Sequence, residues 1–145
     1  QYYGFDTFEG YVEETISDNP WLSNNAWKND ECKIENVKKR IQKADLSDTC
    51  TLFKGDCRKT IKKFLRKDNY PISIAFFDLN SHNATFSILK QISKFFIKGS
   101  ILVFFQFQRN DINGERKALM NFLKSFKEKK INISKYYKSI SYIEL

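Results

Sequence analysis

The chain has 145 residues, with 25 Lys and Arg against 17 Asp and Glu and a formal net charge of +8. This length allows one domain, and a hydrophobic fraction of 41% with 14 Phe can build a core, which excludes wholesale disorder and a coiled coil. No run approaches the ~20 apolar residues of a membrane span, and the first residues show no signal-peptide pattern. We therefore expect a cytoplasmic protein without a membrane partner.

The first half of the chain predicts alternating strands and helices. The aromatic segment Tyr2 to Phe8 is typical of a short buried strand, and the polar residues 11–33 predict a long loop or lid. Apolar residues at helical spacing indicate an amphipathic helix from Ile34 to about Asp45. Thr49 to Lys54 then predicts a strand, and Ile61, Phe64 and Leu65 mark a short helix.

The second half continues the alternation. The segments are a strand at Ile72 to Phe77 covered on both faces, a helix after Ser81 ended by a Lys98-Gly99 cap, a central strand at Ser100 to Phe107, a helix opened by Asn113-Gly114-Glu115, and two short strands at Ile131 to Tyr137 and Ser141 to Leu145. The order predicts one α/β domain over residues 1–145, with a mostly parallel sheet, helices on both faces and a C-terminal antiparallel hairpin.

Ligands of such sheets bind beyond the carboxyl ends of the strands. The polar residues at these ends are Asp6, Asp56 with Cys57, Asp78 to His82, and Gln106 to Arg109. A carboxylate there can accept hydrogen bonds from ribose hydroxyls or an adenine amino group. The alternative is that each Asp caps a helix or a turn.

The charge, the cysteines and the glycines limit which partners, metals and cofactors the protein is expected to bind. The basic residues lie on amphipathic helices apart from the aromatic runs, so we expect no nucleic-acid partner. Cys32, Cys50 and Cys57 form no CxxC pair, which favours reduced thiols over a zinc site or a disulfide framework. The five glycines are scattered, so the sequence contains no Gly-rich phosphate-binding loop.

The segment Phe5-Asp6-Thr7-Phe8-Glu9-Gly10 resembles the FDTFEG segment of class I S-adenosylmethionine-dependent methyltransferases of the macrocin O-methyltransferase-like group, which modify sugar hydroxyls. Further matches follow in order: Phe53-Lys54-Gly55 ahead of Thr60, Phe77-Asp78 to Thr85 in place of D-x-D-x-Y-x-x-T, Lys98 to Phe104, Asn113-Gly114-Glu115 with Ala118-Leu119, and Ser141-Tyr142-Ile143. The resemblance covers nearly all of the chain outside residues 11–33 and implies a Rossmann-like fold.

The resemblance implies a site for S-adenosylmethionine. Asp6 would hold the ribose, Asp56 with Cys57 would lie near the adenine, and Asp78 would stand at the reacting centre. His82 is the only histidine, and its ordinary pKa of about 6.5 suits a general base oriented by Asp78. The alternative is a surface-loop imidazole with no role.

Two departures from the family change the expected chemistry. Its second acidic residue in the loop after the fourth strand is Asn80 here, and its paired acids at the end of the fifth strand fall on Phe104-Phe105 or Gln106. Amides and phenyl rings neither bind Mg²⁺ strongly nor take a proton at neutral pH, so we predict no metal. The family's Gly-rich turn would precede Gln1, so we expect a preceding segment. Without that segment the sheet would have an exposed apolar edge, which could pair with a second copy of the chain to form a homodimer.

These observations leave three hypotheses. The leading one is an O-methyltransferase that modifies a hydroxyl of a sugar or small polar metabolite, with residues 11–33, including Trp21 and Trp27, as the acceptor lid. The second is a non-catalytic binding or assembly module on the same scaffold. The third, a nucleic-acid binder or RNA methyltransferase, rests on charge alone and predicts affinity that falls steeply with salt.

Overall fold

The computed structural model describes residues 1–19, 28–67, 70–107, 114–124 and 130–145. The chain forms two compact units, unit 1 at Gln1–Phe64 and unit 2 at Leu65–Leu145. A single domain over residues 1–145 stays a prediction. In the part of the chain that the structure describes, no helix combines the length and the apolar character needed to cross a membrane.

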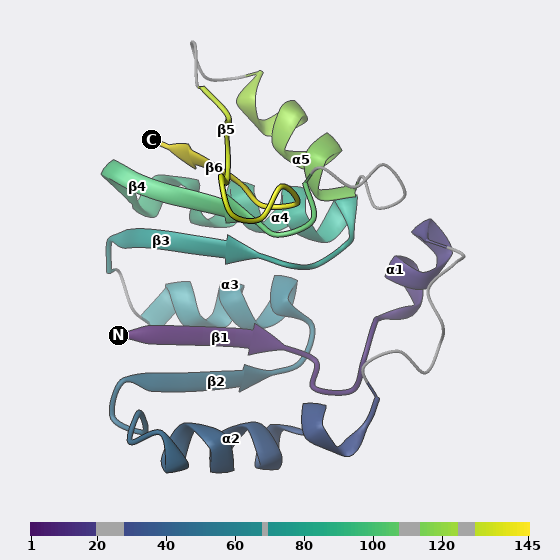
Figure 1. Ribbon diagram of the computed structural model, residues 1–145, viewed down its shortest axis with the longest axis vertical. Coiled ribbons are helices and arrows are strands. Elements are labelled where there is room, and N and C mark those ends of the chain that lie inside the picture. Colours follow the sequence, from purple (N-terminus) through teal and green to yellow (C-terminus); the bar gives the residue numbers. More distant parts are fainter. Residues whose placement is uncertain (20–27, 68–69, 108–113, 125–129) are drawn as a thin grey trace. The chain divides into compact units, whose positions relative to one another are not determined.

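Unit 1 is built on two parallel strands (Figure 1). Its elements are β1 (Tyr2–Asp6), α1 (Glu13–Asp18), η1 (Asp30–Cys32), α2 (Ile34–Lys43) and β2 (Cys50–Lys54), followed by α3 (Cys57–Lys67), which runs past the end of the unit. The register pairs Tyr2 with Cys50 and Asp6 with Lys54, so β1 and β2 end at the same edge. Both strands, α2 and α3 agree with the sequence prediction.

An aromatic cluster joins α3 to these strands. Phe5 stacks on Phe53 with ring centroids 4.8 Å apart. Phe64 of α3 meets Phe53 edge-on at 5.4 Å and lies 4.6 Å from the Tyr3 ring. Offset and edge-on aromatic pairs add about 0.5–1.5 kcal/mol beyond the burial of their area. The cluster therefore fixes the start of α3, where Asp56 and Cys57 lie, relative to β1.

The prediction for residues 11–33 is partly wrong, because the segment contains α1 and the short 3₁₀ helix η1. In α1 the side chain of Asn19 donates to the Thr15 carbonyl at 2.9 Å, which satisfies the last turn. Two acidic residues, Glu13 and Glu14, favour its first turn. A helix of 6 residues is too short for a periodic pattern. Residues 20–27, which include Trp21 and Trp27 of the expected lid, lie outside the described residues.

Unit 2 contains a four-stranded sheet and two longer helices (Figure 1). Its elements are β3 (Ile72–Phe77), α4 (His82–Ile92), η2 (Ser93–Phe95), β4 (Phe96–Phe104), α5 (Gly114–Leu123), β5 (Asn132–Ile133) and β6 (Ser141–Glu144). The strand order is β3-β4-β6-β5; β3 and β4 are parallel, and β6 is antiparallel to both β4 and β5. The predicted α/β fold, parallel pairing and C-terminal hairpin are confirmed.

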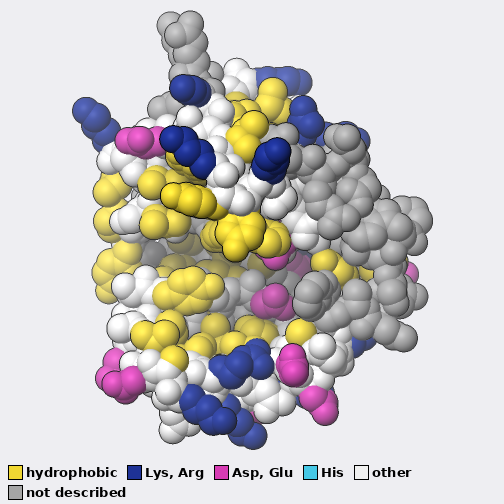
Figure 2. All heavy atoms as spheres, viewed as in Figure 1, with side chains coloured by type: hydrophobic (Ala, Val, Ile, Leu, Met, Phe, Trp, Pro, Cys, Tyr) yellow, Lys and Arg dark blue, Asp and Glu magenta, His cyan; other side chains and the backbone are white. Residues whose placement is uncertain are grey.

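The two faces of the β3–β4 ladder differ in burial. Phe77 and Phe104 stack at 4.8 Å on one face and are buried. On the other face Ile74 and Phe76 remain 64% and 57% exposed. Figure 2 shows hydrophobic side chains at the surface in the region of these strands. The prediction that β3 is covered on both faces is wrong, because an apolar run alone does not reveal what covers each face.

The predicted helix end at Lys98-Gly99 is also wrong. Helix α4 ends at Ile92, and β4 begins at Phe96, so Gly99 lies inside the strand with φ 89°. The register jumps there, from Ile72 paired with Phe96 to Ile74 paired with Ile101. Glycine tolerates this backbone conformation and therefore accommodates the bulge. The apolar residues that follow Ile92 kept helical spacing in the sequence and concealed the change of element.

Candidate functional site

The first candidate residue, Asp6, ends β1 and organises the turn that follows. Its Oδ1 accepts the backbone N–H of Phe8 at 2.6 Å, and Phe8 has a left-handed backbone with φ 56°. The Thr7 hydroxyl donates to the Gly10 carbonyl at 2.6 Å and closes the turn. Asp6 is exposed, and among the described residues none donates to its Oδ2. One carboxylate oxygen is thus available to a ligand while the other fixes the loop.

Asp56 directly precedes α3 and lies close to the end of β1. The backbone N–H of Gly55 donates to the Asp6 carbonyl at 2.8 Å, so the two strand ends are directly joined. The Asp56 carboxylate accepts the backbone N–H of Arg58 at 2.9 Å and its guanidinium through Nε and Nη2 at 2.7–3.1 Å. Unit 1 thus brings Asp6, Asp56 and Cys57 to one edge.

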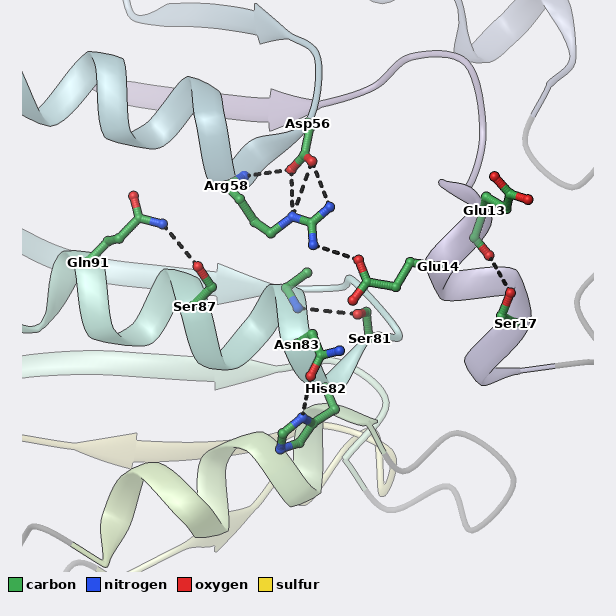
Figure 3. A network of polar contacts seen from close by, with 11 residues as sticks. Glu13, Glu14, Ser17, Asp56, Arg58, Ser81, His82, Asn83, Ser87 and Gln91 are labelled. Atoms are coloured by element: carbon green, nitrogen blue, oxygen red, sulfur yellow. Dashed lines mark hydrogen bonds and ion pairs between the residues drawn. The ribbon is translucent and has the colours of Figure 1, made fainter.

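Arg58 links Asp56 to α1 (Figure 3). Its Nη1 donates to Glu14 Oε2 at 2.6 Å, so one guanidinium joins two carboxylates. The guanidinium holds the pKa of Asp56 below its ordinary value of 3.8. Sequence reasoning missed both Arg58 and Glu14, which are 44 residues apart. The pairing occupies much of the acceptor capacity of Asp56, and the adenine contact predicted for Asp56 stays a prediction.

The Arg58 pairing predicts a pH-dependent effect of Asp56→Asn. Because the folded-state pKa is lowered, the pairing stabilises the fold above pH 3.8 and is lost as pH falls through the folded value. Urea unfolding at pH 6 should show the variant less stable than wild type by about 1–2 kcal/mol, and the difference should shrink at pH 3. The exposed Asp48→Asn controls for removing one negative charge. An equal difference at both pH values would contradict the assignment.

Cys57 is the second residue of this turn that the sequence singled out. Burial, with the nearby Asp56 charge, raises the pKa of its thiol from 9.0 to about 11. The side chain is therefore a neutral thiol at physiological pH, which suits contact with an uncharged group such as an adenine ring.

The raised pKa predicts slow alkylation of Cys57. At pH 8 the two-unit shift from 9.0 to about 11 lowers the thiolate fraction roughly 100-fold. Iodoacetamide labelling followed by peptide mass spectrometry should show Cys57 reacting about 100-fold more slowly in the folded protein than in the same protein unfolded in about 8 M urea. Equal rates in the two conditions would disprove a half-buried, protonated thiol.

In unit 2 the candidate residues flank the loop between β3 and α4. Asp78 is exposed and follows the last residue of β3 directly. The next turn contains Asn80, which is 1% exposed and has a left-handed backbone with φ 54°. The Ser81 hydroxyl accepts the Ala84 N–H at 3.3 Å and caps α4. Asn80 is therefore a structural part of the loop, and Asp78 is its accessible acid.

Glu115 of α5 binds the backbone of this loop. Its Oε1 accepts the backbone N–H groups of Leu79 and Asn80, the latter at 3.1 Å, and the side chain is 1% exposed. Burial raises its pKa above the ordinary 4.5, against the effect of the amide donors. Sequence reasoning saw Glu115 only as part of a helix start, because a Glu in a first helical turn is normally solvated.

His82, the proposed base, begins α4 and is held by two amides. Its Nδ1 lies 3.0 Å from Asn83 Oδ1 (Figure 3), and its Nε2 lies 3.2 Å from Asn121 Nδ2. With the amides oriented in this way, Nδ1 donates and Nε2 accepts. The ring also stacks on Phe86 at a centroid distance of 5.8 Å. The side chains of Asn83 and Asn121 thus orient the imidazole. Its orientation by Asp78 stays a prediction.

The remaining site predictions concern metal ligands and the end of β4. Among residues 1–19, 28–67, 70–107, 114–124 and 130–145, no group of three or more His, Cys, Asp and Glu side chains is arranged to hold a metal ion. Phe104 is fully buried, and Phe105 lies on the exposed face. Gln106 is partly exposed, whereas residues 108–113, with the predicted Arg109, lie outside the described residues.

These features define a Rossmann-like α/β protein of the class I methyltransferase fold. The apo structure of CalS11, a TDP-rhamnose 3'-O-methyltransferase in calicheamicin biosynthesis, matches with a TM-score of 0.73, 21% identity and coverage of 98% of this chain and 57% of that one. The O-methyltransferase NovP matches with a TM-score of 0.74, 12% identity and coverage of 98% and 58%.

A third match is TomG from Streptomyces achromogenes, an O-methyltransferase of tomaymycin synthesis solved with S-adenosylmethionine, with a TM-score of 0.62, 13% identity and coverage of 99% and 72%. The chain thus spans less than three fifths of CalS11 and NovP. No family model and no curated protein matches it in sequence. At these identities the likeness establishes the fold, and the narrower macrocin O-methyltransferase-like assignment stays a prediction.

Proposed function

We propose that the chain is part of an S-adenosylmethionine-dependent O-methyltransferase whose acceptor is a hydroxyl of a sugar or another small polar metabolite, and that it acts in the cytoplasm. One observation carries the proposal. Asp6 stands exposed at the carboxyl end of β1 with Oδ2 free of described donors, in a fold that CalS11 and NovP share. That oxygen fits the paired hydroxyls of a ribose.

The residues of unit 1 fit the cofactor by their acceptor and apolar groups. Asp6 would hold the ribose hydroxyls, while the turn that Phe8 and Gly10 complete keeps its carboxylate at the strand end. The Arg58 pairing fixes the start of α3, and the neutral Cys57 thiol beside it would line the adenine side. When bound, S-adenosylmethionine supplies an electrophilic methyl group.

The residues of unit 2 would serve the acceptor. Asp78 is an exposed acid at the end of β3 and would bind an acceptor hydroxyl. His82 Nε2 would take the hydroxyl proton, for which Asn121 must release it. We retain the prediction that no divalent metal takes part, since Asn80 is buried in the loop and Phe104 lies in the core.

Calorimetric titration of the protein with S-adenosylhomocysteine tests the proposal. We expect saturable binding of S-adenosylhomocysteine and none of NAD⁺, which also contains adenine and ribose and is the matched ligand control. The absence of binding at millimolar S-adenosylhomocysteine would overturn the proposal. A methyltransferase assay with sugar nucleotides and radiolabelled S-adenosylmethionine then identifies the acceptor class.

A non-catalytic binding or assembly module remains the second candidate. It is favoured by the two asparagines that engage both ring nitrogens of His82, since an engaged nitrogen is a poorer proton acceptor. In cells that depend on the protein, Asp6→Ala and Asp78→Ala distinguish the two functions. Unchanged cell function supports the module, and loss of function with normal protein abundance supports the enzyme.

A further inference from the structure

A buried carboxylate, Glu115, contacts the loop that contains Asp78. Glu115 is 1% exposed, and among the described residues no Lys or Arg forms an ion pair with it. Removing a carboxylate from water costs several kcal/mol unless hydrogen bonds replace the lost hydration. The fold therefore retains a costly group here, and its contacts indicate what that group does.

Glu115 directs two hydrogen bonds to one loop, and the backbone of Gln106 also acts on its carboxylate. Its Oε1 accepts the backbone N–H groups of Leu79 and Asn80, two consecutive amides just after Asp78. Its Oε2 is buried and has no hydrogen bond from the described residues. Position 115 lies in the first turn of α5, where the helix dipole also favours a negative charge. One oxygen thus fixes the direction of two peptide planes.

The backbone of the loop has an uncommon conformation. Asn80 has φ 54°, a left-handed region that Asn tolerates better than most non-glycine residues but still at a small cost. The Glu115 carboxylate offsets this cost only in the observed loop conformation, since both N–H groups must point at the same oxygen. Asp78 stands immediately before the two anchored amides.

A close approach of α5 to α4 places Glu115 under the loop. A Cβ at Gly114 would lie 2.7 Å from the backbone nitrogen of His82 and 3.2 Å from the Asn80 carbonyl oxygen. The absence of a side chain at Gly114 therefore lets the first turn of α5 contact the loop directly. The next residue along, Glu115, then reaches the two amides from within the unit.

We propose that Glu115 is a positioning residue, whose buried carboxylate anchors the Leu79 and Asn80 amides and thereby sets how Asp78 and His82 face the ligand. The role of Glu115 in positioning the ligand-facing residues rests on the proposed function, whereas its anchoring of the two amides does not. The alternative is a carboxylate that stabilises unit 2 without influence on ligand binding.

Two substitutions separate these roles. Glu115→Gln keeps an oxygen that can accept both amides, whereas Glu115→Ala removes it; Glu144→Gln, at an exposed position of β6, is the matched control. By NMR, Glu115→Ala should speed hydrogen exchange of the Leu79 and Asn80 amides by roughly 10- to 100-fold, while the core amides Leu89 and Leu102 keep their rates. Glu115→Gln and Glu144→Gln should leave all four near wild type.

Methyl transfer by the same variants from radiolabelled S-adenosylmethionine to a sugar nucleotide tests the role in ligand positioning, because the proposed function assigns Asp78 and His82 to the acceptor. We expect Glu115→Ala to lower the transfer rate by about tenfold while S-adenosylhomocysteine affinity stays near wild type, and Glu115→Gln to restore the rate to within about twofold. If the Leu79 and Asn80 amides stay protected in Glu115→Ala, the anchor is refuted. If they are released but the transfer rate is unchanged, the positioning role is refuted. If wild type itself transfers no methyl group, the proposed function fails, and the exchange result still decides the anchor.

Discussion

Gly114→Ala is expected to destabilise unit 2 by about 2–3 kcal/mol, because it inserts a methyl group against backbone atoms that cannot rotate away. The added Cβ would lie 2.7 Å from the His82 nitrogen, closer than real Cβ contacts, and 3.0 Å from the Ser81 carbonyl carbon, tighter than most of them. Helix α5 would have to move away from α4, and Glu115 would move with it. Urea unfolding monitored by circular dichroism measures the loss.

Two controls separate this clash from other effects of alanine. Met120→Ala changes a side chain on the same helix that is 49% exposed, and it should cost less than about 0.5 kcal/mol. Gly99→Ala meets no atom within 4 Å but has φ 89°, so it should cost about 1–2 kcal/mol through backbone strain alone. A Gly114→Ala protein as stable as the Met120→Ala protein would show that the helices are not in close contact.

Asp6→Asn is expected to weaken S-adenosylhomocysteine binding by roughly 10- to 100-fold while the fold stays intact. The amide oxygen of Asn can still accept the Phe8 N–H that closes the turn, so the loop keeps its shape. What is lost is the charge of the oxygen proposed to face the ribose, and a hydrogen bond to a charged group contributes about 1.5–3 kcal/mol. Calorimetric titration gives the ratio of dissociation constants.

The exposed Asp48→Asn, also in unit 1, is the matched control and should bind like wild type. Its backbone carbonyl accepts a bond from Gln1, which the substitution does not alter. Equal affinities of wild type and Asp6→Asn would remove Asp6 from the binding site. A variant that has lost its thermal transition would instead assign to Asp6 a role in folding.

The sequence predicted the elements with a strong local pattern. The helix at Ile34 and the strands at Cys50 and Ile72 lie where spacing and β-branched or aromatic content placed them. It failed where a local pattern continued across a change of element, as between Ile92 and Gly99. It also failed for α1, which is too short to show a period.

The residues of the candidate site were also predictable only in part. The sequence predicts Asp6, Asp56 and Asp78 as site residues because the carboxyl ends of parallel strands are a general place for ligands. Arg58 and Glu115 were missed because their roles depend on partners that only the folded chain supplies. The sequence places Glu14 and Arg58 44 residues apart, and nothing local marks a glutamate that will be buried.

The two asparagines that hold His82 have a consequence for how its ring can take up a proton. In the neutral ring Asn121 donates to Nε2, and a protonated ring would place two N–H groups face to face. Asn83 already presents an oxygen to Nδ1, so only the Asn121 amide must change. A half-turn of that amide exchanges its nitrogen for its oxygen with almost no movement of heavy atoms. The position of the proton on the histidine ring is therefore tied to the orientation of one side-chain amide on α5, and ¹⁵N NMR of the imidazole reports which ring nitrogen carries the proton.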